Sequence, residues 1–253
     1  MTTTSPIAVI TGGSRGLGRN AAIHLARQGT DVILTYRGQR AEAESAVAEI
    51  ERLGRRAAAL QLDVADSRSF ADFAAQVKSV LAGWGRSRFD FLLNNAGIGL
   101  HAAFADTTEE QFDELMRVHL KAPFFLTQAL LGLIADGGRI LNVSTGLARF
   151  ALPGYSAYAT MKGGVEVLTR YLAKELGARG ISVNTLAPGA IETDFSGGVV
   201  RDNEEVNTFV SSVTALGRPG KPDDIGAVVA ALFAPGTGWI NAQRVEASGG
   251  MML

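Results

Sequence analysis

The sequence predicts an α/β protein in which a doubly wound, mostly parallel seven-stranded sheet carries helices on both faces. Two observations support this fold class. Short runs that are apolar at nearly every position alternate with longer stretches in which apolar residues have helical spacing. No composition break and no linker rich in Pro, Gly or Ser divides the 253 residues, so we expect a single domain, residues 1–253.

The predicted elements alternate regularly along the chain. Short apolar runs predict strands at residues 7–10, 32–36, 57–62, 89–93, 139–144, 181–186 and 244–247. Helical spacing predicts helices at residues 17–28, 41–53, 67–81, 109–134, 156–176 and 223–233. Residues 194–218 are polar and predict irregular structure.

Composition excludes several function classes. The chain has no Cys, which rules out a disulfide scaffold and a thiolate nucleophile. Its 24 Lys+Arg nearly balance 25 Asp+Glu, whereas a general nucleic-acid binder needs a basic face. No apolar stretch approaches the roughly 20 residues that span a bilayer, and the first residues do not form a signal peptide. We therefore expect a cytoplasmic protein with neither nucleic-acid nor membrane partners.

A glycine-rich turn follows the first predicted strand. Gly12, Gly16 and Gly18 stand between that strand and the helix that comes next. Glycines at such a turn let the backbone approach a pyrophosphate, and the helix N-terminus offers free N–H groups to its charge. This strand–turn–helix context predicts a dinucleotide site in a Rossmann fold.

Further motifs occur in a consistent order. Asp63-Val64 follows the third strand and Asn94-Asn95-Ala96-Gly97 the fourth, and then come Tyr158-x-x-x-Lys162 and Pro188-Gly189. Together with Thr11-Gly12-x-x-x-Gly16-x-Gly18, they make the chain resemble the short-chain dehydrogenase/reductase family over essentially its whole length. Among family members it resembles 3-oxoacyl-[acyl-carrier-protein] reductases most. The resemblance implies hydride transfer between a nicotinamide cofactor and a ketone or aldehyde–alcohol pair.

The resemblance also implies where the cofactor binds. Asp63 and Val64 would contact its adenine end, residues 95–97 a ribose, and Thr193 the carboxamide. Carried over position by position, the implied contacts are Gly12, Ser14, Arg15, Gly16, Leu17, Gly18, Arg37, Asp63, Val64, Asn95, Ala96, Gly97, Tyr158, Lys162, Pro188, Gly189, Ile191 and Thr193.

The end of the second strand bears on the choice between NAD(H) and NADP(H). An acidic residue there would hold a ribose hydroxyl, but Arg37 follows the strand and Asp31 precedes it. Arg37 and Arg15 could converge on a 2′-phosphate with fork geometry. We predict NADP(H) over NAD(H), against the alternative that Arg37 is a solvated loop residue.

Tyr158 and Lys162 are the expected acid/base pair. Four residues apart on a helix, they share a face. A neighbouring ammonium favours the phenolate, so we expect the pKa of Tyr158 to be lowered. The pair could then exchange a proton with a carbonyl or alcohol oxygen, unless it is merely a surface Tyr/Lys pair.

Three further residues carry open alternatives. The resemblance implies a hydroxyl 13 residues before the tyrosine, which is Thr145, with Ser144 as runner-up. It implies Asn where this chain has His119; the imidazole could join a proton relay and titrate near neutrality, or be an ordinary buried histidine. Tyr155, seven residues before Lys162 on the same predicted helical face, suggests either a pocket wall or simple packing.

The remaining expectations concern substrate and assembly. The resemblance implies that residues 192–216 cover a small-molecule carbonyl or alcohol, and that the chain forms a homo-oligomer, a tetramer or alternatively a dimer. We expect helices 109–134 and 158–176 to contribute to that contact. His24 and His101 lack partners at ligand spacing, so we expect no catalytic metal. Two other functions stay open: a non-catalytic NADP(H)-binding sensor or scaffold, and an enoyl reductase.

Overall fold

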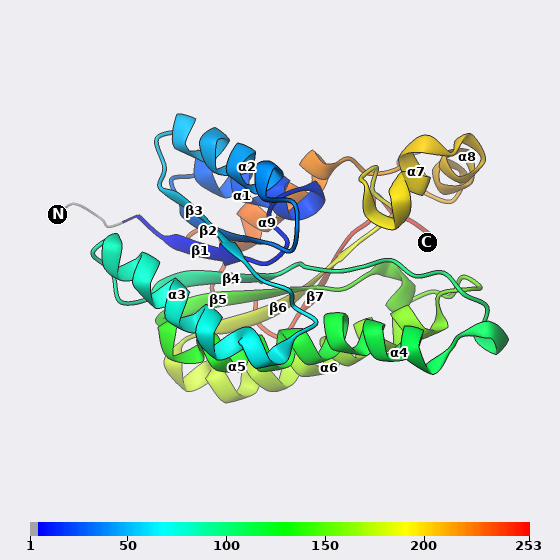
Figure 1. The fold of residues 1–253 in the computed structure, drawn as a ribbon. Helices are drawn as coiled ribbons and strands as arrows, with labels where there is room; N and C mark the ends of the chain where they lie inside the picture. The colour runs from blue at the N-terminus through cyan, green and yellow to red at the C-terminus, as the bar shows by residue number, and fades with distance from the viewer. Residues whose placement is uncertain (1–4) are drawn as a thin grey trace.

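The computed structural model describes residues 5–253 (Figure 1). Seven strands form one sheet in the order β3-β2-β1-β4-β5-β6-β7, and every pair of neighbouring strands is parallel. Their bounds are β1 Ile7–Ile10, β2 Asp31–Tyr36, β3 Ala57–Gln61, β4 Phe89–Asn94, β5 Ile134–Val143, β6 Ser182–Pro188 and β7 Arg244–Ala247. This arrangement confirms the predicted fold class. The strand order reverses between β1 and β4, which is where ligands bind in such sheets.

Helices cover both faces of the sheet (Figure 1). One face packs against α1 (Gly16–Arg27), α2 (Arg40–Arg52) and α9 (Pro222–Phe233). The other packs against α3 (Phe70–Gly83), α5 (Ala122–Leu130) and α6 (Ser156–Leu176). In β1, Ile7 and Val9 enter one core while Ala8 and Ile10 enter the other. Because successive side chains of a strand alternate between faces, burial on both sides explains why the strands are apolar throughout.

The predicted helix 109–134 is wrong as a single element. The chain forms α4 (Glu109–Met116), a π-helical turn (Arg117–Lys121), α5 and a 3₁₀ turn (Leu131–Leu133). β5 then begins at Ile134, five residues earlier than predicted, and its pairing with β4 shifts register near Phe89. Gly137, which resembles a helix stop in the sequence, has a φ of 76° within this irregular strand. The apolar spacing is nearly unchanged by one wide turn, so it does not reveal the break.

Residues 194–218 are not irregular throughout, as the sequence predicts, but contain α7 (Val199–Asp202) and α8 (Glu204–Ser212). The side chain of Asn203 accepts a hydrogen bond from the Val206 N–H at 3.0 Å, and two acidic residues occupy the first turn of α8. Both features stabilise a helix N-terminus. These helices stand beside the C-terminus of the chain (Figure 1).

Within residues 5–253, none of the helices combines the length and the apolar character that crossing a bilayer requires.

Candidate active site

One large cleft of about 860 Å³ lies at the carboxyl ends of the central strands. The predicted catalytic residues Thr145, His119, Tyr158 and Lys162 all line it. So do the residues of the predicted cofactor set, apart from Gly18. Segments far apart in the sequence are therefore brought to one site.

Gly18 lies beneath the glycine turn rather than on the cleft wall. A Cβ there would collide with the carbonyl oxygen of Gly12 and come within 2.6 Å of Asn95 Nδ2. Gly16 adopts a φ of 54°, a conformation that favours glycine. Arg15 precedes α1 without a side-chain capping bond, so the first N–H groups of this helix face the cleft uncapped. A close turn and a free helix N-terminus fit a pyrophosphate.

Two threonines whose own role was not predicted from the sequence hold this turn in place: Thr11, the first residue of the glycine motif, and Thr35. Thr11 Oγ1 accepts hydrogen bonds from the backbone N–H groups of Asn95 and Ala96, at 2.9 and 3.0 Å. Thr35 Oγ1 accepts one from the N–H of Gly12 at 3.1 Å. The threonines thus join the glycine turn to β2 and to the segment after β4. Only their position at strand ends could have indicated this role.

The cation pair predicted for a 2′-phosphate lies at the cleft. Arg15 and Arg37 are both exposed, both line the cleft, and neither forms an ion pair among the described residues. Asp31 is buried and bound by Arg55 and Arg56 at 2.8 and 2.7 Å. Its carboxylate is therefore unavailable to a ribose, and the charge at this end of the cleft suits an anion.

Tyr158 and Lys162 lie on α6 and are buried, with 9% and 5% of their surfaces exposed. Lys162 Nζ donates a hydrogen bond to the carbonyl of Val143 at 2.7 Å and lies 5.7 Å from the centroid of the Tyr158 ring. Burial raises the pKa of Tyr158 above its ordinary value, although hydrogen bonding with Thr145 acts the other way. The expectation of a lowered tyrosine pKa is therefore wrong for this protein, because desolvation exceeds the favourable contacts. Burial also lowers the pKa of Lys162 to about 7.

The two candidate hydroxyls have different partners. Ser144 Oγ donates a hydrogen bond to Glu166 Oε1 at 2.7 Å. Thr145 Oγ1 accepts a hydrogen bond from the N–H of Leu147 at 3.3 Å and lies near enough to Tyr158 to affect its pKa. The Ser144 hydroxyl is thus directed at Glu166, whereas the Thr145 hydroxyl is directed at Tyr158.

His119 lies in the π-helical turn and is 1% exposed. Its Nε2 is 2.7 Å from the carbonyl oxygen of Ile98, its Nδ1 has no partner among the described residues, and its ring meets that of Tyr158 edge-on at 5.0 Å. Burial and the nearby Lys162 hold the pKa of His119 well below 6.5. The expectation that it titrates near neutrality is therefore wrong, and the imidazole is neutral at pH 7; its Nε2 also lies 3.3 Å from the backbone nitrogen of Ile98.

The far end of the cleft is apolar and rich in rings. Tyr155 lines it as the N-cap residue of α6, and Lys162 lines the same cleft. The ring of Tyr155 packs edge-on against His101 at 5.0 Å, and Phe195 lies 6.3 Å from Tyr158 between ring centroids. Other apolar lining residues come from the segment after β5 and from α7 and α8, namely Phe150, Leu152, Val199, Val200, Val206, Phe209 and Val210.

Comparison with known proteins decides the family. A family model described as Enoyl-(Acyl carrier protein) reductase matches residues 12–252. FrzI of Cladobotryum sp, named a short-chain dehydrogenase/reductase, is 36% identical over 250 residues, which cover 97% of this chain and 95% of FrzI. The chain belongs to the short-chain dehydrogenase/reductase family. The predicted enzyme class, an oxidoreductase acting on the CH–OH/C=O pair, is confirmed by relatives named as reductases, such as the hydroxynaphthalene reductase arp2 of Aspergillus fumigatus, 32% identical over 94% of this chain and 89% of arp2.

Solved structures of this short-chain dehydrogenase/reductase family agree with the fold. LugOII, described as a promiscuous reductase that catalyses keto-reduction at C1 in lugdunomycin biosynthesis, has a TM-score of 0.93 and 36% identity, covering 99% of both chains. The angucycline C-6 ketoreductase LanV, solved with bound NADP, has a TM-score of 0.93 and 34% identity, covering 98% of this chain and 95% of LanV.

Proposed function

We propose that this enzyme reduces a ketone of an apolar, ring-containing small molecule to an alcohol, with NADPH as the reductant. The observation that carries the proposal is the convergence of Thr145, Tyr158 and Lys162 at the middle of one cleft. One end of that cleft fits a dinucleotide, and the other is lined by aromatic and aliphatic side chains. Pockets of this shape favour an apolar ligand held by a few polar groups.

In the proposed reaction, Thr145, Tyr158 and Lys162 have different roles. NADPH, when bound, supplies the hydride. Thr145 donates a hydrogen bond to the substrate carbonyl oxygen and so orients it beside the phenol. Tyr158 gives its proton to that oxygen as negative charge develops there. Charge appearing on the phenolate favours the protonated form of Lys162, whose pKa of about 7 lets it respond near neutral pH.

His119 has a supporting part in this proposal. A neutral imidazole with a bare Nδ1 can accept a hydrogen bond beside Tyr158 and Lys162. It cannot act as an acid at pH 7, because its pKa is too low. We therefore assign His119 the role of a hydrogen-bond acceptor beside Tyr158 and Lys162. It does not donate the proton of the reaction.

Preference for NADP(H) over NAD(H) rests on Arg15 and Arg37. Two unpaired guanidiniums at the adenine end of the cleft suit a 2′-phosphate. Binding of NADP to LanV and of NADPH to a blue fluorescent protein of 34% identity supports the choice. An Arg37→Asp variant should lose most of its preference in the ratio of kcat/KM for NADPH and NADH. An unchanged ratio would contradict the assignment.

The substrate class draws on the ring-lined end of the cleft and on the relatives. LugOII is described as catalysing keto-reduction at C1 during lugdunomycin biosynthesis, and LanV as an angucycline C-6 ketoreductase. The segment 192–216, which includes α7 and α8, contributes Phe195, Val206 and Phe209 to the lining, so we propose that it covers the bound ring system. We therefore favour a multi-ring aromatic ketone.

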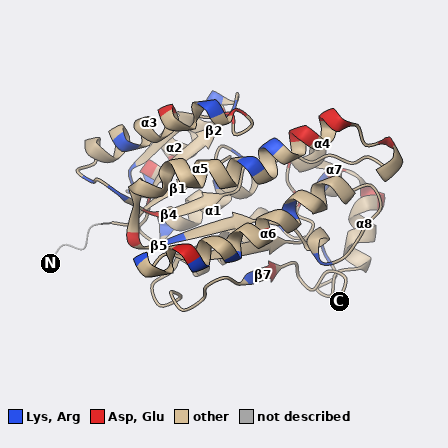
Figure 2. Cartoon of the chain, turned by 90° about the horizontal axis from the view of Figure 1, so that it is seen from below, with Lys and Arg blue, Asp and Glu red and all other residues tan. Residues whose placement is uncertain are grey.

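We also propose that the enzyme is a homo-oligomer, with a tetramer as the first expectation. α5 contains no charged residue, and the exposed charged residues of α6 lie in its C-terminal half (Figure 2). They expose Phe124, Phe125, Val167 and Tyr171, the last with 65% of its surface accessible. Apolar exposure of this kind is typical of a subunit contact. Light scattering should find a multiple of 26.6 kDa, and a stable monomer would contradict the proposal.

The cytoplasmic location stays a prediction.

The decisive assay is NADPH consumption with a panel of multi-ring aryl ketones, simple aldehydes and α,β-unsaturated thioesters. Ketone reduction should be fastest, with the alcohol as product. Fast reduction of the carbon–carbon double bond alone would favour the enoyl reductase suggested by the family model's description. Tight NADPH binding without turnover of any compound would favour the sensor or scaffold.

A further inference from the structure

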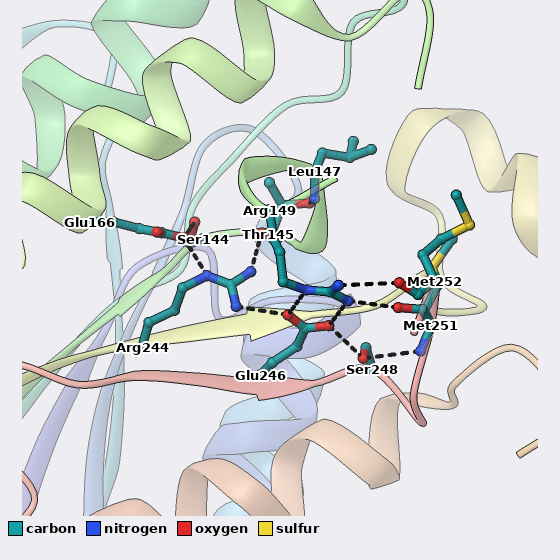
Figure 3. A network of polar contacts seen from close by, with 10 residues as sticks. All are labelled: Ser144, Thr145, Leu147, Arg149, Glu166, Arg244, Glu246, Ser248, Met251 and Met252. Atoms are coloured by element: carbon teal, nitrogen blue, oxygen red, sulfur yellow. Dashed lines mark hydrogen bonds and ion pairs between the residues drawn. The ribbon is translucent and has the colours of Figure 1, made fainter. Parts of the chain in front are cut away.

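A network of charged side chains lies directly behind the loop that carries Thr145 (Figure 3). At its centre is Arg244, on strand β7, whose side chain is 24% exposed. Its guanidinium donates hydrogen bonds in three directions: Nε to Glu166 at 2.8 Å, Nη1 to Glu246 at 2.7 Å, and Nη2 to the backbone carbonyl of Thr145 at 3.1 Å. One side chain therefore joins its own strand to two other segments of the chain, α6 and the loop after β5.

Two of these segments carry the chemical groups of the site. Glu166 lies on α6, four residues after Lys162 and eight after Tyr158, so it projects from the same side of the helix. The carboxylate of Glu166 also accepts the hydrogen bond from Ser144 Oγ at 2.7 Å. Arg244 and Glu166 thus connect the helix of the phenol to the loop of the threonine hydroxyl.

We propose that Arg244 is a positioning residue that fixes the distance between the Thr145 hydroxyl and the Tyr158 phenol. The inference rests on the proposed function, because a carbonyl oxygen must be held between these two groups for the distance to matter. The Thr145 side chain accepts the N–H of Leu147 and hydrogen-bonds with Tyr158, and its carbonyl accepts the N–H of Ala148 at 3.3 Å in the short 3₁₀ turn that follows. Arg244 adds a side-chain hydrogen bond to the same carbonyl at 3.1 Å and ties it to a distant part of the chain.

A guanidinium suits this task because its donors lie in one rigid plane. Lysine could satisfy one of the three acceptors but not all of them. A displacement of about 1 Å at a reacting group can lower a rate on the order of 100-fold, so a modest shift of the loop should be visible in kcat.

The network is supported from its far side by Arg149. This residue holds Glu246 through two hydrogen bonds of 2.8 and 2.7 Å, and donates to the carbonyls of Met251 and Met252 at 2.7 and 3.1 Å (Figure 3). Hydrogen bonds from Arg149 and Arg244 lower the pKa of Glu246 to about 2. The carboxylate stays ionised at any working pH, so the anchor of Arg244 does not loosen through titration.

The test is a double-mutant cycle in kcat between Arg244→Met and Thr145→Ala, measured on the aryl ketone that the wild-type enzyme reduces best. Arg244→Met alone should lower kcat by about 10- to 100-fold, with the Kd for NADPH unchanged within about twofold. In the Thr145→Ala background the same substitution should lower kcat by less than about twofold, because the group that it positions is gone. An equal loss in both backgrounds, or no loss in either, overturns the proposal.

Arg179→Met is the matched control. Arg179 is also partly buried and also binds a carboxylate and backbone carbonyls, those of Asp136, Leu131 and Ile134, but at the opposite end of the sheet. It should lower the melting temperature while leaving the kcat of the folded enzyme within about twofold of wild type. A loss of kcat like that of Arg244→Met would show that any lost arginine has this effect, which also overturns the proposal.

Two milder variants keep the test valid if Arg244→Met does not fold. Glu166→Gln removes the charge that Arg244 binds, and Arg244→Lys retains the charge without the forked donors of a guanidinium. Both variants should lower kcat in the wild-type background and not in the Thr145→Ala background.

If the wild-type enzyme reduces no carbonyl at all, the proposed function fails first. The positioning role falls with it, and this outcome differs from a cycle in which wild type turns over and the losses simply add.

Discussion

At the scale of single residues, two neighbouring hydroxyl groups can differ in whether they are available to a substrate. Ser144 and Thr145 both line the cleft, yet Ser144 gives its proton to Glu166 while Thr145 faces Tyr158. The sequence left both as candidates, because spacing alone cannot show which way a side chain points. Their partners in the fold separate them.

Thr145→Ala should lower kcat by about 100- to 1,000-fold, the usual loss when one donor to a developing oxyanion is removed. Ser144→Ala should keep kcat within about tenfold, since it removes only a hydrogen bond to Glu166. Steady-state kinetics at saturating NADPH compare the two. An active Thr145→Ala beside an inactive Ser144→Ala would reverse the assignment.

His119 should make the folded protein sensitive to acid. Its pKa is near 6.5 in the unfolded chain and well below that in the folded one. Below pH 6.5 the unfolded state therefore binds a proton that the folded state does not, and stability falls as the pH falls, by at most about 1.4 kcal/mol per pH unit. Above pH 6.5 both states are neutral and the effect vanishes.

Thermal unfolding of wild type and His119→Asn at pH 7.5 and pH 5.0 measures this. Relative to the variant, wild type should lose about 1–2 kcal/mol of unfolding free energy between the two pH values. Taking the difference between the proteins cancels the titration of groups that they share. A stability difference that is the same at both pH values would mean that His119 is not held neutral by the fold.

At the scale of elements, the glycine turn between β1 and α1 combines tight packing with an open anion site. Gly18→Ala would place a methyl group against the Gly12 carbonyl and Asn95, which forces the turn outward. We expect the Kd for NADPH to rise at least about tenfold and the unfolding free energy to fall by about 1–3 kcal/mol, the cost of overpacking.

Gly83→Ala is the matched control for that measurement. Gly83 is the last residue of α3, and a Cβ there would meet no atom within 4 Å. The Kd for NADPH should stay unchanged, and stability should be equal or up to about 1 kcal/mol higher, since Ala is the better helix former. Weakened NADPH binding in Gly83→Ala, or unchanged binding in Gly18→Ala, would contradict this account of the turn.

Elements with a strong local signal were predictable from the sequence. Residues 156–176 form α6 with the predicted bounds, because an uninterrupted apolar face and flanking turns mark both ends. The π-helical turn at residues 117–121 was not predictable, since one extra residue in a turn hardly alters apolar spacing. α7 and α8 were missed because they are short and polar, and Val210 is the only buried residue of α8.

For the site, short-range motifs were sufficient to find residues but not their electrostatics. The spacing of Tyr158 and Lys162 predicted that they would share a helix face, and both residues line the cleft. It could not predict that desolvation would raise the pKa of Tyr158, because burial depends on the whole fold. Arg244 was missed for a similar reason: its contact with Thr145 spans 99 positions of sequence.

At the scale of the whole molecule, the two cores lie on opposite faces of the sheet, and the cleft opens at the carboxyl ends of its central strands, beside the strand-order reversal. The proposed cofactor end lies after β1 and β4, while α6, the loop after β5 and residues 192–216 line the proposed substrate end. The proposed function therefore depends on holding segments from distant parts of the sequence in fixed positions around Tyr158.

The most direct test of the central claim is the kcat of Tyr158→Phe for ketone reduction by NADPH, measured with the Kd for NADPH in the same preparation. The variant keeps the ring and its contacts with His119 and Phe195 and loses only the ionisable hydroxyl. We predict a loss of about 100- to 10,000-fold in kcat with an NADPH Kd within about threefold of wild type. A variant that retains more than about a tenth of the wild-type kcat would contradict Tyr158 as the proton donor.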